Sequence, residues 1–297
     1  MPQSPIVFDR ALLRERMRRA LARGPETFLV DRVAADLAER LGAVLRQFGV
    51  AVDLGTPTDA VCDALADNAA IGMLVAASAL ARRAPAIVAD EEALPLRDAS
   101  LDLVVSALAL QFVNDLPGAL VQIRRALKPD GLFLAALLGG DTLGELRQSF
   151  AAAESEVEGG VSPRVAPFAD VREMGALLQR AGFALPVTDV ERLTVRYSSP
   201  FILMGELRRM GATNALAERR RTPLRRATLQ RMAEIYAQRF ADPDGKIRAT
   251  FEVIWLSGWA PHESQQKPLR PGSAQARLAD ALGTREIGTG EKAGEGA

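Results

Sequence analysis

Cysteine and histidine are almost missing from this sequence, whose 297 residues contain one of each, Cys62 and His262. A single cysteine excludes a disulfide framework and any metal site built from several thiolates. It also fits a reducing compartment. Because a lone histidine in a proline-rich segment is typical of a protein surface, we do not expect His262 to be a general base. The residues therefore point to no metal site and single out no catalytic residue.

An excess of either charge is also missing. Lys and Arg together number 37, as do Asp and Glu, so the formal net charge is zero. No bulk attraction to nucleic acid or to an anionic membrane follows from such a balance. The longest uncharged apolar stretch, residues 69–80, is too short to span a bilayer, and the N-terminus lacks a signal-peptide apolar region. We expect a cytoplasmic protein without a nucleic-acid partner or a transmembrane segment.

Short apolar runs alternating with amphipathic segments are what the sequence does contain. Leu116, Leu120, Ile123 and Leu127 fall at helical spacing, and Asn114-Asp115 precedes them as a helix cap. Apolar runs that predict buried strands lie at 50–55, 71–75, 86–89, 101–106 and 132–138. Runs that alternate polar and apolar residues, typical of antiparallel strands, lie at 190–197 and 251–257. The pattern predicts an α/β fold of seven strands: five in parallel βα units and a closing antiparallel pair.

Between and around these strands we expect helices. Two N-terminal helices, within residues 1–45, should pack on the core, the second capped by Asp31, and a short helix should occupy 76–83. The main domain would cover 46–262, with helical insertions at about 141–182 and 200–242. Residues 263–297, rich in Pro, Gln, Gly and Ser, predict a tail whose end is disordered.

Polar residues follow several predicted strands at their carboxyl ends, where open α/β sheets bind ligands. Asp53 and Gly55 follow the first strand, and Asp90-Glu91 follows the third. A carboxylate such as Asp90 can accept from an exocyclic amine, which suits an adenine, and Gly55 lets the backbone approach a ligand closely. Asp53 has two readings, as a residue that positions a ligand through the loop amides or as a cap of the following turn.

Residues 89–117, ADEEALPLRDASLDLVVSALALQFVNDLP, resemble the central motif region of class I S-adenosylmethionine-dependent methyltransferases. The sequence is closer still to the bacterial methyltransferase-like assembly factors of respiratory complex I, over residues 6–282. Supporting segments lie at 8–10, 137–143, 145–147, 159–164, 177–183, 209–214, 258–262 and 265–268.

This resemblance implies a seven-stranded Rossmann-like methyltransferase fold with S-adenosylmethionine as cofactor. It implies a methyltransferase-like enzyme that modifies or helps to assemble a complex I subunit, by methyl transfer or, as associated with the mitochondrial relative, by hydroxylating an arginine of an iron–sulfur subunit. The residues it places at the cofactor are Asp53, Gly55, Asp90, Glu91 and Ser106. Those it places on the substrate side are Gln111, Phe112 and Arg164.

The sequence departs from the methyltransferase pattern at two positions around the cofactor. The second and third glycines of the loop after strand one are replaced by Pro57 and Asp59, and residues 75–78 lack the acid that holds the ribose. These departures favour an alternative, a pseudoenzyme that serves as a protein-binding assembly factor. A second alternative, a small-molecule methyltransferase of biotin or quinone synthesis, rests on the central motif alone.

Eight arginines concentrate positive charge between Arg208 and Arg231. A solvated helical face is the ordinary reading of such a run. The other readings are a docking surface for an acidic partner and a peripheral contact with the inner membrane.

Overall fold

The computed structural model describes residues 6–266, 283 and 284. It divides the chain into a unit that ends at His262 and a second unit that begins at Glu263. Most of the tail expected to be disordered lies outside the described residues.

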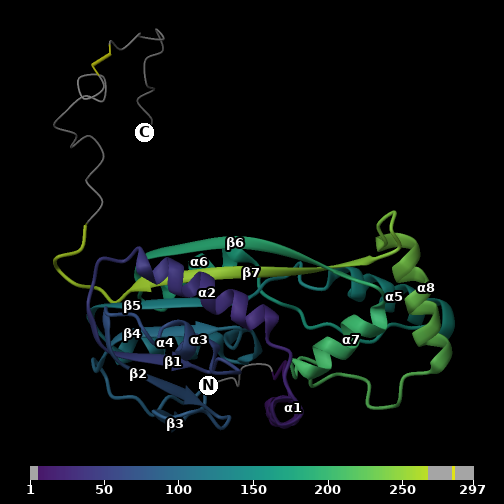
Figure 1. Ribbon diagram of the computed structural model, residues 1–297, viewed down its shortest axis with the longest axis horizontal. Coiled ribbons are helices and arrows are strands. Elements are labelled where there is room, and N and C mark those ends of the chain that lie inside the picture. The colour runs from purple at the N-terminus through teal and green to yellow at the C-terminus, as the bar shows by residue number, and fades with distance from the viewer. Residues whose placement is uncertain (1–5, 267–282, 285–297) are drawn as a thin grey trace, which may run out of the picture. The chain divides into compact units, whose positions relative to one another are not determined.

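Seven strands form one sheet in the order β3-β2-β1-β4-β5-β7-β6 (Figure 1). Strands β1 to β5 pair in parallel, and β7 pairs antiparallel with both β5 and β6. The expected fold class, with its closing antiparallel pair, is confirmed. The strands are β1 (Phe48–Leu54), β2 (Ile71–Ser78), β3 (Ala86–Val88), β4 (Leu101–Ala107), β5 (Leu127–Leu138), β6 (Ala184–Tyr197) and β7 (Ile247–Trp259).

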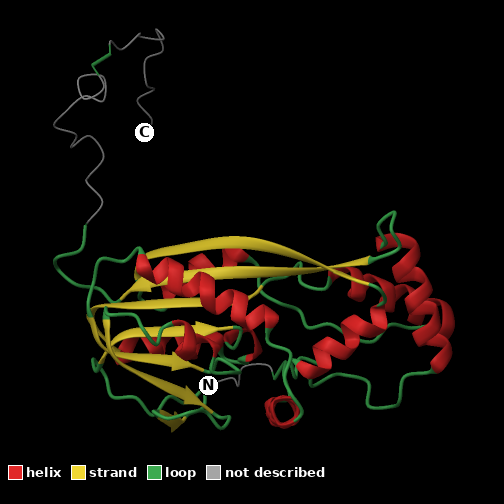
Figure 2. Cartoon of the chain, viewed as in Figure 1, coloured by secondary structure: helices red, strands yellow, loops and turns green. Residues whose placement is uncertain are grey.

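Helices cover the sheet on both faces and extend it at one end (Figure 2). The helices are α1 (Arg10–Ala22), α2 (Phe28–Gly42), α3 (Ala60–Ala64), α4 (Leu116–Ala126), α5 (Gly144–Glu158), α6 (Val171–Arg180), α7 (Pro200–Arg209) and α8 (Arg226–Phe240), with a 3₁₀ turn at Leu110–Phe112. Asp115 caps α4 by accepting from the amide of Gly118, as its position before the apolar stripe predicts.

Neighbouring residues of the central strands serve two different cores. In β4, Leu103 and Val105 pack with the cluster that contains Leu37 of α2, whereas Val104 between them packs with Ile123 of α4. This alternation follows from the two-residue repeat of a strand. Because both faces are covered, β4 reads in the sequence as a continuous apolar run.

Strands β6 and β7 are longer than the rest and run beyond the other strands toward α5, α7 and α8 (Figure 1). Residues 247–252 of β7 pair only with β6, whereas 253–259 also pair with β5. The helices at this end enlarge the molecule beside the carboxyl edge of the sheet. Of the described helices, none has the length and apolar character needed to cross a membrane.

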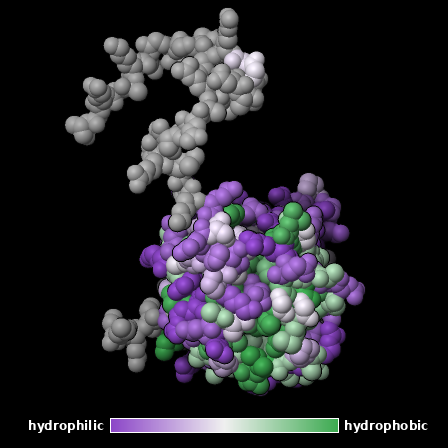
Figure 3. All heavy atoms as spheres, turned by 90° about the vertical axis from the view of Figure 1, so that its left-hand side faces the viewer, coloured by the Kyte–Doolittle hydropathy of each residue, from purple (hydrophilic) through white to green (hydrophobic). Residues whose placement is uncertain are grey.

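Four local expectations were wrong. Residues 71–75 form a strand, as expected, but the strand is not buried there, since Met73 is 49% exposed. The helix expected at 76–83 is absent, because Ala76 and Ala77 continue the pairing of β2 with β1. The run at 86–89 is not a buried strand: β3 is the sheet edge, and Val88 is 86% exposed. Apolar surface gathers toward the bottom of Figure 3, the side on which β2 and β3 lie in Figure 1. Asp31 lies inside α2, whose N-cap is Thr27.

Candidate functional site

The carboxyl ends of β1, β2 and β4 meet at one edge of the sheet, because β1 lies between the other two. Gly55 follows β1 with a φ of +72°, and its amide donates to the carbonyl of Ala77 in β2. A Cβ at this position would lie 2.9 Å from Oε1 of Glu91, so a side chain is excluded here on both counts. The close approach that Gly55 permits is therefore taken up by the Glu91 side chain.

Asp53, at the end of β1, is fully buried and held by three side chains. It accepts from the hydroxyl of Thr56, and Nη2 of Arg82 lies 3.1 Å from its Oδ2. The Sγ of Cys62 lies 3.6 Å from the same oxygen. Burial raises the pKa of this carboxyl, and Arg82 opposes that rise. Asp53 therefore ties the loop after β1 to the segment after β2.

Arg82 also neutralises the acid that replaces a loop glycine. Its Nε lies 2.8 Å from Oδ1 of Asp59, and its Nη1 donates to the carbonyl of Thr56. Although partial burial opposes ionisation of Asp59, the hydrogen bond from Arg82 leaves its pKa lowered. The side chain of Arg82 is 1% exposed. The negative charge of Asp59 is thus compensated within the protein and does not stand open toward a ligand.

Asp90 and Glu91 lie at the carboxyl edge, as expected, but two arginines of α1 hold them. Nη1 of Arg10 lies 2.5 Å from Oδ1 of Asp90, and Nη2 of Arg14 lies 2.6 Å from Oδ2. Arg10 also pairs with Glu91, and its Nη1 lies 3.0 Å from Oε2 of Glu92. We call these contacts the α1 latch. They occupy the carboxylate oxygens that would recognise an adenine.

Acid should weaken the α1 latch. Although partial burial disfavours ionised Asp90, hydrogen bonds from Arg14, the Glu92 amide and Arg10 lower its pKa to about 2, from an ordinary value of 3.8. Since the pKa is depressed in the folded state, this stabilisation is complete above about pH 4 and is lost as the pH falls toward 2. Thermal unfolding followed across that window should show a smaller loss of Tm in Asp90→Asn than in the wild-type chain. Equal losses in the two proteins would contradict the role of Asp90.

With α1 in this place, little space remains where the adenosyl part of the implied cofactor would lie. A hollow of about 30 Å³ is bounded by Gly55, Ser78 and Glu91, and by Leu13 and Met17 of α1. That is on the order of one water molecule's share of liquid volume. The adenosyl part of S-adenosylmethionine does not fit this hollow in the arrangement of the structure.

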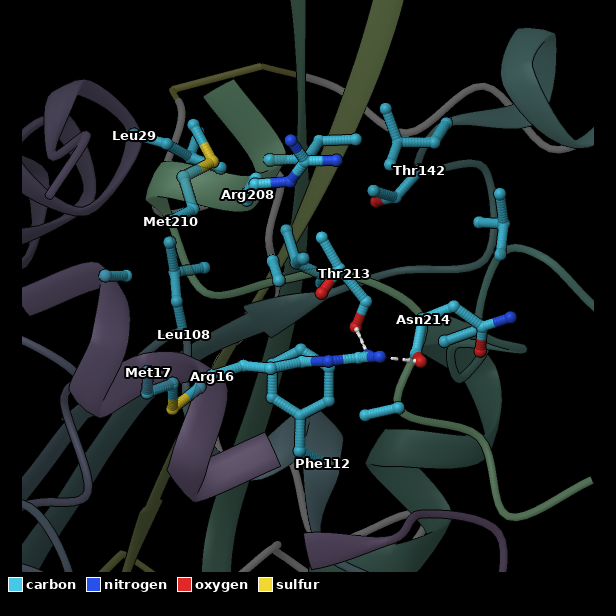
Figure 4. Close-up of a pocket in the computed structure, with 18 of the residues that line it drawn as sticks. Arg16, Met17, Leu29, Leu108, Phe112, Thr142, Arg208, Met210, Thr213 and Asn214 are labelled. Atoms are coloured by element: carbon cyan, nitrogen blue, oxygen red, sulfur yellow. Dashed lines mark hydrogen bonds between the residues drawn. The ribbon is translucent and has the colours of Figure 1, made fainter. Parts of the chain in front are cut away.

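A cavity of about 320 Å³ lies beside this hollow, and the three substrate-side residues line it (Figure 4). Gln111 is buried and donates through Nε2 to the carbonyl of Leu108, 2.7 Å away. Phe112 lines both spaces. Arg164 contacts Glu154 through Nε at 2.8 Å. The cavity therefore brings Gln111, Phe112 and Arg164 together, and their role toward a substrate stays a prediction.

Ser106 is placed differently from the other residues expected at the cofactor. It is fully buried within β4, and its hydroxyl donates to the carbonyl of Leu54, 2.7 Å away. This bond joins β4 to the end of β1. Ser106 therefore supports the end of β1, just before the loop. Its role toward the cofactor stays a prediction.

Known proteins resemble this chain in sequence and in fold. A model of a methyltransferase domain matches residues 51–135. Over the whole chain, the human protein "Arginine-hydroxylase NDUFAF5, mitochondrial" is 40% identical across 287 residues, which are 92% of this chain and 82% of the relative. The chain belongs to the NDUFAF5 arginine-hydroxylase family.

Two matches outside this family share less of the chain. The malonyl-[acyl-carrier protein] O-methyltransferase of Laribacter hongkongensis is 42% identical over 191 residues, covering 64% of this chain and 62% of the relative. The solved YcgJ protein of Bacillus subtilis superposes with a TM-score of 0.52 at 14% identity, over 78% of this chain and 99% of that one. The latter shows a shared fold.

Three residues that shape the site of this NDUFAF5-family chain were missed in the sequence. Arg82 follows β2, shortly after the position where the ribose-binding acid is absent, and it pairs with Asp53 at the end of β1 and with Asp59 in the loop after β1. Arg10 and Arg14 are spaced one helical turn apart, which suits recognition of a group such as 90–92. Both signals are visible in the sequence, but pairing across about eighty positions requires the fold.

Proposed function

We propose that this protein acts on respiratory complex I by hydroxylating an arginine of one of its protein subunits during assembly. The observation that supports this is the extent of the likeness: NDUFAF5 matches 92% of the chain, whereas the malonyl-[acyl-carrier protein] O-methyltransferase matches 64%. Helices α7 and α8 lie outside residues 51–135, the part of the chain that the methyltransferase-domain model matches. A function that needs the whole chain is favoured over one that needs the central domain.

Hydroxylation inserts one oxygen atom of dioxygen into a carbon–hydrogen bond of the arginine. The second oxygen atom leaves as water, and an external reductant supplies two electrons and two protons. The residues of this chain would bind and position the subunit. The second candidate, a pseudoenzyme that only assembles, is favoured by the closed hollow beside Asp90 and by Pro57 in the loop after β1.

Mass spectrometry of complex I subunits distinguishes these functions. Subunits isolated from a deletion strain, and from the same strain carrying the wild-type gene, are compared peptide by peptide. We expect one arginine to gain an oxygen atom only when the gene is present. A gained methyl group would contradict hydroxylation and support methyl transfer. An unmodified arginine in a complex I whose assembly still depends on the gene would support the pseudoenzyme.

For the cofactor, we propose that S-adenosylmethionine binds only when α1 has moved away from Asp90 and Glu91. Those two carboxylates lie at the carboxyl edge of the sheet, where an adenine is recognised in this fold. Their pairing with Arg10 and Arg14 competes with that use. Binding is therefore expected to be weak in the wild-type chain.

The partner surface we propose is smaller than the arginine run. Arg209, Arg219, Arg220 and Arg231 pair with acids of the chain itself. Arg221, Arg225 and Arg226 are exposed, and the described residues provide them with no ion pair. We propose that these three arginines dock an acidic face of the partner subunit. The protein would approach that subunit from the cytoplasm, at the inner membrane.

A further inference from the structure

The 320 Å³ cavity is mostly apolar, and it is roughly ten times the liquid volume of a water molecule. Met17 of α1, Leu29 of α2, Leu108 and Phe112 after β4 and Met210 after α7 form its walls (Figure 4). Pockets of this size with apolar walls and a few polar groups are typical of sites for small molecules. The walls alone suit a chain of roughly ten carbon atoms.

Two arginines that form no ion pair among the described residues bring positive charge to these apolar walls. Arg208 is an exposed residue, and Asp9 partly offsets the charge of Arg16. Arg16 donates through Nη1 to the backbone carbonyls of Thr213, at 3.1 Å, and Asn214. Arg208 enters from α7 in the upper part of Figure 4, and within the described residues it has no ion pair or side-chain hydrogen bond. Burial, together with the charge of Arg219, lowers the pKa of Arg16. An anion placed between these groups would relieve that cost.

The other charged residues of the cavity are already compensated. Arg164 pairs with Glu154, whose side chain is 1% exposed. Arg209 pairs with Glu26, the one acid that lines the cavity among the described residues. Within the described residues, Arg16 and Arg208 are therefore the cations of the cavity that form no ion pair. A guanidinium group entering this space would meet two like charges, so the cavity does not suit an arginine side chain.

Gln111 adds a polar requirement. Its Oε1 is buried and has no hydrogen-bond partner, while its Nε2 is held by Leu108. A buried acceptor without a donor destabilises the folded protein. A ligand that brings an O–H or N–H group to this oxygen would remove that destabilisation.

We propose that the cavity binds a fatty carboxylate, a carboxylate that carries a long alkyl chain. Its carboxylate lies between Arg16 and Arg208, and its chain lies along the walls formed by Met17, Phe112 and Met210. A hydroxyl on the chain would donate to Oε1 of Gln111. This ligand goes beyond the arginine modification proposed above, since the charges that attract it repel an arginine. The fatty carboxylate would bind in this cavity in addition to the protein partner and would not replace it.

Calorimetric titration of the full chain tests this with dodecanoate, dodecanol and 3-hydroxydodecanoate, each below its micelle concentration. We expect dodecanoate to bind at least about tenfold more tightly than dodecanol, a difference of about 1.4 kcal/mol. The hydroxylated acid should bind more tightly than dodecanoate. Equal binding of the acid and the alcohol would overturn the proposed recognition of the carboxylate.

Two substitutions locate the binding. Arg208→Gln should weaken dodecanoate about tenfold and leave dodecanol unchanged, because it removes the charge and leaves the apolar walls. Arg221→Gln, an exposed arginine that does not line the cavity, is the matched control and should change neither. Ala166→Phe, which fills part of the cavity, should weaken both ligands. A dodecanoate affinity that falls equally in the two arginine variants, or that survives Ala166→Phe, would overturn the site.

Discussion

Replacing Arg82 by methionine should lower the free energy of unfolding by about 3–5 kcal/mol, the cost of breaking a buried ion pair by removing one partner. Methionine retains most of the apolar volume but leaves Asp53, which is fully buried, without its cation. The carbonyl of Thr56 and the carboxylate of Asp59 lose a donor in the same step. The loop after β1 therefore loses the contacts that hold it to the segment after β2.

Arg83→Met is the matched control, since it changes the same residue type one position along the chain. Arg83 pairs with Asp63, but the two side chains are 61% and 59% exposed. An exposed pair contributes about 0–1 kcal/mol, so this variant should lose no more than that. Urea unfolding followed by circular dichroism measures both. Similar losses in the two variants would contradict a buried, structural role for Arg82.

A double variant separates charge from packing. In Asp53→Asn combined with Arg82→Met, no ionised group is left at the buried position of Asp53. The double variant should therefore be more stable than Arg82→Met alone, with a coupling of about 0.5–3 kcal/mol. If Asp53→Asn adds its own loss to that of Arg82→Met, the interaction between the two residues is not the source of the effect.

The sheet was predictable because its signals are local. In β4 and in α4, the apolar spacing around Val104 and Ile123 follows directly from strand and helix geometry, and both residues are fully buried. The predictions of local structure failed where contacts with distant parts of the chain determine the conformation or the burial of a segment. An apolar run such as Ile87-Val88 predicts a buried strand, but the run itself does not indicate that the strand lies at the edge of the sheet. The alanines at 76 and 77 favour a helix, yet their pairing with β1 overrides that propensity.

The candidate site divides in the same way. That Asp53, Gly55 and Asp90 lie at the carboxyl edge follows from strand ends, which the sequence marks. What those residues contact could not be predicted, because Arg82 and Arg10 reach them across 29 and 80 positions. Such pairing depends on how α1 and the β2–β3 connection fold over the sheet. The strand ends marked in the sequence locate the carboxyl edge of the sheet, and the three-dimensional contacts determine which ligand that edge can bind.

Substituting Arg10 and Arg14 together by alanine should raise the affinity for S-adenosylmethionine by about five- to thirtyfold. An affinity that is limited by a closed state rises in proportion to the open fraction, and removing several partly buried ion pairs shifts that fraction by about 1–2 kcal/mol. The substitution frees Asp90 and Glu91, whose carboxylates the latch otherwise occupies. Isothermal titration calorimetry of the wild-type and double-variant chains measures the gain.

The outer face of the same helix provides the control for this gain. Arg18 and Arg19 pair only with Glu15 and are 56% and 64% exposed, so Arg18→Ala/Arg19→Ala changes the charge of α1 equally without touching the latch. That variant should bind the cofactor as weakly as the wild-type chain. Adding Asp90→Ala to the Arg10→Ala/Arg14→Ala variant should remove the gain, because the freed carboxylate is what would recognise the adenine. If both arginine variants gain alike, a general loosening of α1 is responsible, and if neither binds, the hollow beside Asp90 is no longer a nucleoside site.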